Sequence, residues 1–142
     1  MKKIIFLSLI IPLIIGSCAK EEKSPIEGTW EIVYFSSPEL PQTFPAQVQG
    51  SQIKIFTKEH FVFAGQFNLD TVWQDNYGWG TYTLDGNKYS ENVVLHASKP
   101  TMGQTVRILV EVRNDTLTQS YPTDENWNLP EKYSIEKYVR VK

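Results

Sequence analysis

The sequence predicts an all-β domain, a small closed antiparallel barrel of eight strands that begins near residue 26. Three observations predict this fold. After Pro25, no segment keeps apolar residues at the i, i+3, i+4 and i+7 positions of an amphipathic helix through three turns. Alternating runs rich in β-branched and aromatic residues recur instead, and turn residues separate them at short intervals. Eight such runs with hairpin connections match a common size of antiparallel barrel.

The predicted strands follow one another along the chain. Asp85-Gly86-Asn87 and Asn114-Asp115 are strong hairpin signals, because these residue types adopt positive φ at little cost. The segments 36–51, 68–78 and 122–130 are predicted to be loops, and three prolines argue against a helical lid in the first. The eight strands are predicted at residues 29–35, 52–57, 61–67, 79–84, 88–96, 105–113, 116–121 and 133–141.

Side-chain alternation shows which residues share a face in the first strand and in the hairpins at 85–87 and 114–115. The first strand places Trp30, Ile32 and Tyr34 on one face. A loop at 114–115 pairs Val110 with Gln119. The residues expected to face the interior from the two strong hairpins are Tyr82, Leu84, Tyr89, Glu91, Val93, Leu95, Ile108, Val110, Val112, Leu117, Gln119 and Tyr121.

The register of the hairpin 52–67 stays open at this point. A two-residue loop pairs Ile55 with Val62, whereas a three-residue loop pairs Ile55 with Phe63. The two alternatives place opposite sets of side chains in the interior, because a slip of one residue exchanges the faces of a strand.

The first 17 residues are predicted to be a signal peptide. Lys2 and Lys3 precede the mostly apolar stretch from Ile4 to Ile15, and small residues follow it. As a helix, that stretch rises about 18 Å, well short of the roughly 30 Å of hydrocarbon in a bilayer. We therefore expect a cleaved signal rather than a permanent membrane span.

Ile15-Gly16-Ser17-Cys18 resembles the lipobox of bacterial lipoproteins, and Cys18 is the single cysteine of the chain. The resemblance implies that a diacylglyceryl group is attached to the Cys18 sulfur, that cleavage occurs before it, and that the new amine is acylated, with palmitate among the expected chains. More than one acyl chain makes such an anchor stable. With no second cysteine, the domain has no intramolecular disulfide.

Residues 18–25 are predicted to form a lipidated cysteine and a flexible tether. Ala19 is not the aspartate that retains enterobacterial lipoproteins at the inner membrane, and Lys20-Glu21-Glu22 resembles a charged tag of surface lipoproteins. The resemblances favour an outer-membrane anchor and leave open whether the protein faces the periplasm or the exterior. Without Lys2 and Lys3, 12 of the 14 basic residues remain against 16 acidic ones, so nucleic acid is not an expected partner.

Gly28-Thr29-Trp30 resembles the Gly-x-Trp start of lipocalins and related calycins, in which the tryptophan packs across the closed end of the barrel. Further likeness is found in Ile53-Lys54-Ile55-Phe56-Thr57, in Gly80-Thr81-Tyr82-Thr83 and in the terminal Tyr138-Val139-Arg140. The chain is thus similar, over residues 26–142, to small lipocalin-like lipoproteins of Gram-negative bacteria. The resemblance implies that Trp30 and Arg140 lie at the barrel base.

A ligand site is expected in the interior of this barrel. A buried carboxylate requires partners, and Tyr82, Tyr89 or Arg140 are candidates to supply them to Glu91. A few polar groups in an apolar cavity are typical of a small-molecule site. The predicted ligand-binding residues are Tyr82, Tyr89, Glu91, Gln119 and Tyr121, and the expected ligand is small and largely apolar.

The alternative function is a non-catalytic interaction module. In that case the barrel is filled, and Trp73, Tyr77, Trp79 and Trp127 contact a protein or a glycan. His60 and His96 lack the spacing of a metal motif, so neither a metal nor a cofactor is expected. No nucleophile motif and no carboxylate pair stand out, and we expect no enzyme activity.

Overall fold

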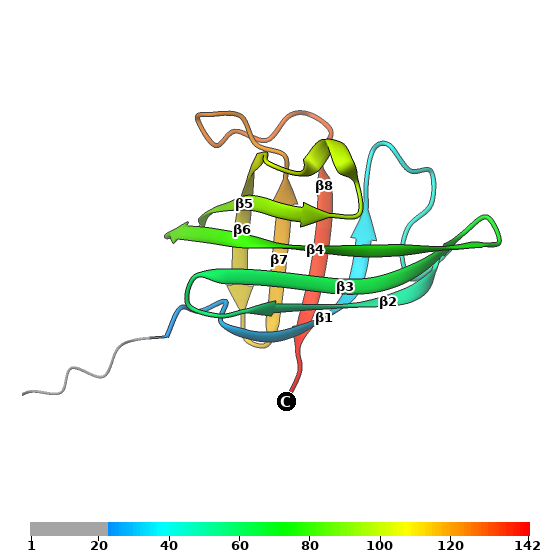
Figure 1. The fold of residues 1–142 in the computed structure, drawn as a ribbon, viewed down its shortest axis with the longest axis horizontal. Helices are drawn as coiled ribbons and strands as arrows, with labels where there is room; N and C mark the ends of the chain where they lie inside the picture. The colour runs from blue at the N-terminus through cyan, green and yellow to red at the C-terminus, as the bar shows by residue number, and fades with distance from the viewer. Residues whose placement is uncertain (1–22) are drawn as a thin grey trace, which may run out of the picture.

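A computed structural model describes residues 23–142, and these residues form a closed barrel of eight antiparallel strands (Figure 1). Each strand pairs with the next one in sequence, and the last pairs with the first, so the sheet has no open edge. The strands are β1 (Gly28–Ser36), β2 (Gln49–Phe56), β3 (His60–Leu69), β4 (Val72–Asp85), β5 (Lys88–His96), β6 (Thr105–Arg113), β7 (Thr116–Tyr121) and β8 (Ser134–Arg140). A single 3₁₀ turn, η1 (Lys99–Thr101), follows β5 in this part of the chain. The predicted fold class is confirmed.

The predicted signal peptide, Cys18 and residues 19–22 of the predicted tether lie outside the described residues. All eight strands and the buried apolar side chains fall between Ile26 and Arg140. The barrel therefore has its own closed hydrogen-bond network and its own core within residues 23–142, as a domain that folds as a unit requires.

In the two hairpins with strong turn signals, Tyr82 shares a face with Glu91 and Val110 pairs with Gln119, as predicted. Asp85 pairs with Lys88 around Gly86, whose φ is +59°, and Tyr82 pairs with Glu91. In the β6–β7 hairpin, Asn114 has a φ of +54° and Val110 pairs with Gln119. Turn residues that accept positive φ fixed these two registers, because a short loop leaves little freedom to the strands beside it.

The β2–β3 hairpin has the register in which Ile55 pairs with Val62. Both of these side chains point away from the barrel and are about 40% exposed, at 39% and 43%. The inward face of β2 consequently carries Gln52 and Lys54, which are both buried. This hairpin thus places its aliphatic residues outside and a lysine inside, the reverse of what hydrophobic alternation alone favours.

A β-bulge in β1 corrects the predicted face of Tyr34. Ile32 pairs with Tyr138, but Tyr34 pairs with Lys137, so the register shifts around Val33. The extra residue exchanges the two faces of the strand beyond it. Tyr34 lies outside, under the ammonium of Lys137 at 5.4 Å from the ring centre, and Phe35 enters the interior in its place.

A second bulge corrects the predicted face of Leu95. The β4–β5 register shifts between Trp79 and Gly80, and Val94 is the unpaired residue. Leu95 therefore pairs with Trp79 on the outer surface and is 42% exposed. Val93, before the bulge, keeps its predicted inward position and is buried.

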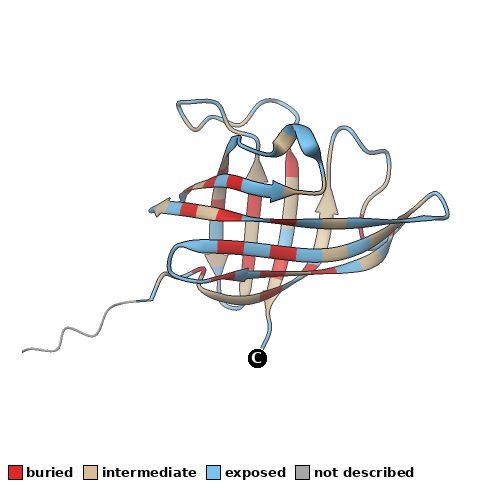
Figure 2. Cartoon of the chain, viewed as in Figure 1, coloured by how far each residue is buried: buried red, intermediate tan, exposed pale blue. Residues whose placement is uncertain are grey.

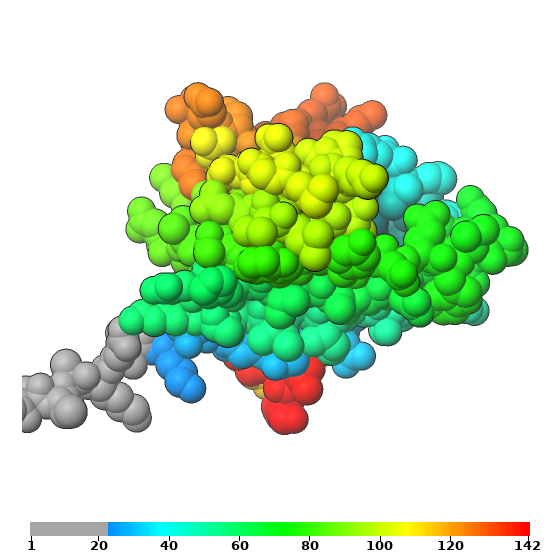
Figure 3. All heavy atoms as spheres, in the orientation of Figure 1, coloured from blue at the N-terminus to red at the C-terminus, as the bar shows by residue number. Residues whose placement is uncertain are grey.

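The segment 68–78, predicted to be a loop, is mostly strand. β3 extends to Leu69 and β4 begins at Val72, so the turn consists of Asp70 and Thr71, both at positive φ. This long hairpin projects beyond the rest of the barrel (Figures 1 and 3). Within 68–78, Leu69 packs against the core, whereas Val72, Trp73 and Tyr77 are exposed. The segment therefore lacks the apolar alternation that would have marked it as a strand.

The segment that precedes β2 runs across the mouth of the barrel without a helix, as its prolines indicated. Its residue Phe44 forms a backbone bridge with Phe35 and packs edge-on against Phe67, with 5.5 Å between ring centres. Phe44 and Val48 are buried. The loop is therefore tied to the barrel by its own apolar side chains.

The opposite end of the barrel is closed by Trp30. This side chain is fully buried, and its indole N–H donates to the carbonyl of Ile26 at 2.7 Å. The guanidinium of Arg140 lies 4.1 Å from the indole centre and donates to the carbonyls of Pro25 and Glu27. Buried positions follow the inward faces of the strands around the whole barrel (Figure 2).

Candidate ligand-binding cavity

A cavity occupies the half of the barrel opposite Trp30. Its volume is about 440 Å³, within the range of small-molecule sites. Its apolar lining comes from the four strands β1, β3, β5 and β6 and from the loop before β2: Ile32, Phe35, Leu40, Phe44, Val48, Phe63, Phe67, Leu69, Val93, Val106 and Ile108. Polar side chains of β2, β4, β5, β7 and β8 line the same space. The arrangement is an apolar cavity with a small set of convergent polar groups.

One polar group of the lining is a buried ion pair between Lys54 of β2 and Glu91 of β5. The distance from Lys54 Nζ to Glu91 Oε1 is 2.6 Å, and the side chains are 4% and 8% exposed. Tyr89 also donates to Glu91 Oε1, at 2.8 Å, and Lys54 donates to Gln119 Oε1 at 3.1 Å. A buried pair stays together because removal of either partner leaves an uncompensated charge.

Four aromatic rings surround the ammonium of Lys54. The ring centres of Phe56, Phe61, Phe63 and Tyr89 lie 5.4–5.8 Å from Nζ. Such rings stabilise a cation through their electron-rich faces. Space for Phe63 depends on Gly78, because a Cβ there would lie 2.7 Å from the ring. The glycine on the inner face of β4 thus lets a ring of β3 lie close to the lysine.

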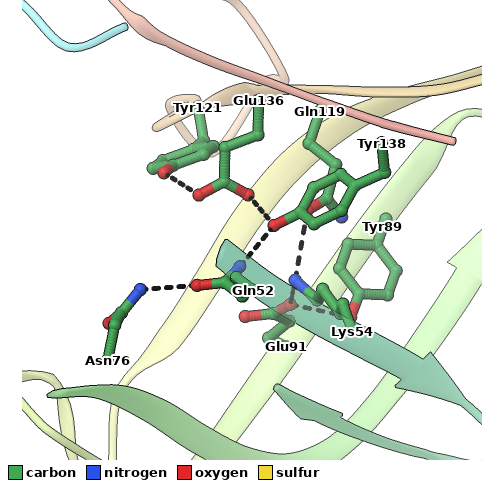
Figure 4. Close-up of polar contacts among 9 residues, drawn as sticks. All are labelled: Gln52, Lys54, Asn76, Tyr89, Glu91, Gln119, Tyr121, Glu136 and Tyr138. Carbon is green, nitrogen blue, oxygen red and sulfur yellow. Dashed lines mark hydrogen bonds and ion pairs between the residues drawn. The ribbon is translucent and has the colours of Figure 1, made fainter. Parts of the chain in front are cut away.

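A second hydrogen-bond network is centred on Glu136 of β8 (Figure 4). Tyr121 donates to Oε1 at 2.7 Å, and Tyr138 donates to Oε2 at 2.6 Å. The hydroxyl of Tyr138 in turn accepts from Gln52 at 2.9 Å, whose own amide oxygen accepts from Asn76 at 2.6 Å. The network runs from β4 across β2 to β8 and on to β7, and so it ties four strands together across the interior.

Three tyrosines of these networks hold their protons firmly. Burial, followed by the charge of Glu91, raises the pKa of Tyr89 well above its ordinary value. Burial and the charge of Glu136 do the same to the pKa of Tyr121 and of Tyr138. The three hydroxyls therefore act as neutral donors toward the carboxylates at neutral pH.

His96, at the end of β5, is a further polar group of the lining. Its Nδ1 accepts from the backbone N–H of Ser98 at 2.8 Å, and its ring meets Phe63 edge-on. Burial lowers the pKa of His96, although Glu91 acts in the opposite direction. A neutral ring that accepts at Nδ1 carries its proton on Nε2, so His96 is a donor.

Of the five residues predicted to bind ligand, two line the cavity and three do not. Glu91 and Tyr121 line the cavity. Tyr89 and Gln119 are fully buried beneath it, where they contact the ion pair. Tyr82 lies nearer the closed end and donates to the carbonyl of Thr57, not to Glu91. The expected pairing of Arg140 with Glu91 is wrong, because Lys54 takes that position and Arg140 lies at the base.

Sequence reasoning missed most of the polar lining: Gln52, Lys54, Asn76, Glu136 and Tyr138. Two of these depended on the unresolved register of the β2–β3 hairpin, and Asn76 stood in a supposed loop. A usable signal was that the register with Ile55 opposite Val62 turns Lys54 inward, since a barrel that buries Glu91 needs a cation nearby. The amide nitrogen of Gln119 is left as a buried donor without a partner.

The aromatic residues singled out for the alternative function lie on the outside. Trp73, Tyr77 and Trp79 are all exposed on β4, and Trp127 lies in the loop before β8, with Lys88 Nζ 5.9 Å from its ring centre. On the outer wall, Trp79 is flanked by Val62 and Leu95 as its pairing partners. Together with Ile55 they form the outer apolar strip, defined here as Ile55, Val62, Trp79 and Leu95.

Within residues 23–142, no three His, Cys, Asp or Glu side chains gather closely enough to hold a metal ion. The same part of the chain contains no helix long and apolar enough to span a bilayer. No known family model matches the sequence, and no curated protein is significantly similar to it.

Proposed function

We propose that this protein is a membrane-anchored, lipocalin-like lipoprotein whose barrel binds one small, largely apolar molecule. The observation that carries the binding role is the cavity of about 440 Å³, with its apolar walls and two ordered polar networks. A filled barrel would have no such space, and a purely structural core would have little use for the polar groups that border it. We assign the protein a binding role without catalysis.

The anchor rests on the sequence Ile15-Gly16-Ser17-Cys18. Its test is expression of the full chain and of Cys18→Ala in a Gram-negative host, followed by membrane fractionation and mass measurement. We expect the native chain in the outer-membrane fraction, with a mass increase from its acyl chains at Cys18. An unmodified Cys18 on a mature chain would exclude the lipoprotein assignment.

The cavity is tested by titration of the chain 23–142 with Nile red, a neutral fluorophore that brightens in apolar surroundings. We expect saturable binding with one site per chain. Val106→Trp fills the cavity, because Val106 belongs to its lining, and should abolish the signal. Val62→Trp is the matched control, since Val62 is 43% exposed on the outer wall and should leave binding intact.

A second candidate function, an interaction module, is supported by the outer apolar strip. Contiguous exposed apolar surface is a common mark of a protein contact, and three of the four side chains are aliphatic, which favours a protein over a glycan. Trp73, Tyr77 and Trp79 lie on β4, and Trp127 alone of the four aromatic residues lies in a loop. The barrel also encloses a cavity, so this candidate now rests on the outer apolar strip. Substitution of Trp79 by Ser would remove that contact and leave Nile red binding unchanged.

A further inference from the structure

The charges around the cavity favour one class of ligand. Besides His96, Tyr121 and Tyr138, which are neutral, the ionisable lining consists of Lys54, Asp75, Glu91 and Glu136, so acidic groups exceed basic ones by two. The single lysine is neutralised by Glu91 at 2.6 Å. The remaining charge that faces the cavity is negative, which attracts a cation and repels an anion.

Lys54 is not available to an incoming anion. Its Nζ already donates to Glu91 and Gln119, and four aromatic rings enclose it. A ligand carboxylate would have to displace Glu91 from the lysine and leave that glutamate buried without its partner, which is costly. Arg140, on the inward face of β8, is occupied by two backbone carbonyls at the closed end. The cavity thus lacks a free cation among its described lining residues.

Acceptors, in contrast, are available. Both hydrogen bonds that Glu91 accepts end on Oε1, and in Figure 4 its other oxygen points away from Lys54. Glu136 accepts one hydroxyl on each oxygen, whereas a carboxylate offers about four acceptor sites. Both glutamates line the cavity and keep acceptor capacity there.

We propose that the cavity selects an amphipathic amine, whose protonated nitrogen binds at Glu136 and Glu91 and whose apolar body lies against the aliphatic and aromatic walls. This inference rests on the proposed binding function and adds the ligand class. The tyrosines hold Glu136 in place, because Tyr121 and Tyr138 each fix one of its oxygens. The ammonium then meets a fixed acceptor in a region of low dielectric, where a charge-assisted hydrogen bond is strong.

The test compares three molecules of equal chain length: dodecylamine, dodecanol and dodecanoic acid. Each displaces Nile red from the chain 23–142 at neutral pH, below its aggregation concentration. We expect dodecylamine to bind about 10-fold more tightly than dodecanol, the scale of one charge-assisted hydrogen bond, and dodecanoic acid to bind most weakly. Calorimetry with Val106→Trp should show no binding of any of the three compounds, which excludes adsorption of the amine outside the cavity.

Glu136→Gln sharpens the assignment. It keeps the shape of the side chain and removes its charge, so dodecylamine affinity should fall about 10-fold while dodecanol affinity is unchanged. Glu111→Gln is the matched control, because Glu111 is an exposed carboxylate on β6 and lies outside the cavity lining. If Glu136→Gln does not fold, the ranking of the three ligands on the native chain still decides the question.

Two results would overturn the inference, and they are distinguishable. Nile red binding together with equal or tighter binding of dodecanoic acid would contradict the amine class and leave the proposed function standing. Absence of binding by Nile red and by all three compounds, checked by calorimetry, would remove both the proposed function and the ligand class.

Discussion

The two ends of the barrel are built differently although the same eight strands form both. At the closed end, Trp30 and Ile26 are fully buried, and Arg140 stacks on the indole. At the other end the strands enclose a cavity of about 440 Å³. Among the described residues, the largest fully buried side chains are Trp30, Tyr89, Tyr138, Phe61, Ile26, Leu117 and Gln119, and of these Tyr138 alone lines the cavity.

This difference shows that close packing and the cavity occupy separate halves of one sheet. Close packing around Trp30 supplies the apolar burial that closes the barrel. The half that contains the cavity buries less apolar surface, and hydrogen-bond networks hold its strands together instead. Substitutions at the two ends and on the outer wall should therefore have different consequences.

The largest effect is expected for Trp30→Ala at the closed end. Loss of a fully buried tryptophan leaves a large cavity and removes the surface on which Arg140 stacks, so the free energy of unfolding should fall by about 3–5 kcal/mol. Denaturant unfolding followed by circular dichroism measures this. A loss below about 1 kcal/mol would show that the base does not hold the barrel closed.

Lys54→Met should cost about 3 kcal/mol, because it leaves Glu91 buried without its cation. Protonation of the orphaned carboxyl limits the penalty. The double variant Lys54→Met with Glu91→Leu should recover most of the lost stability, since apolar side chains of similar size replace a buried pair at little cost. A double-mutant cycle in denaturant gives the coupling, and two additive penalties would refute a paired network.

Stability should also fall at alkaline pH. The pKa values of Tyr89, Tyr121 and Tyr138 are raised in the folded protein, so above pH 10.0, the ordinary tyrosine value, the unfolded chain releases protons that the folded chain keeps. Each such tyrosine should lower stability by about 1.4 kcal/mol per pH unit in that range. Unfolding measured at successive pH values checks this, with Tyr89→Phe expected to show a shallower decline. A flat profile above that pH would contradict it.

The smallest effect is expected for Trp79→Ser on the outer wall. The side chain is 41% exposed and belongs to no part of the core, so stability should change by less than about 0.5 kcal/mol. Unfolding and Nile red titration of the same sample test this. A large loss of stability would mean that the outer wall also stabilises the fold, and it would contradict the expected difference between the outer wall and the closed end.

The sequence by itself determined the eight-strand barrel, the register of the β6–β7 hairpin and the shared face of Tyr82 and Glu91 in the β4–β5 hairpin. Asp85-Gly86-Asn87 and Asn114-Asp115 set their loops so tightly that Tyr82 had to face the same way as Glu91, and Val110 the same way as Gln119. Local turn chemistry is enough in such cases, because the loop that fixes the register lies beside the strands that it joins.

Only the tertiary structure decided which residues meet inside. The bulges at Val33 and Val94 each exchange the faces of a strand, and neither residue marks a bulge in the sequence. The partnership of Lys54 with Glu91 joins residues 37 positions apart in sequence. Closure of the barrel brings β2, β5 and β8 around one interior. There the buried carboxylate of Glu91 needs a cation, and the register with Lys54 inside and Ile55 outside supplies it. No local sequence pattern contains this requirement.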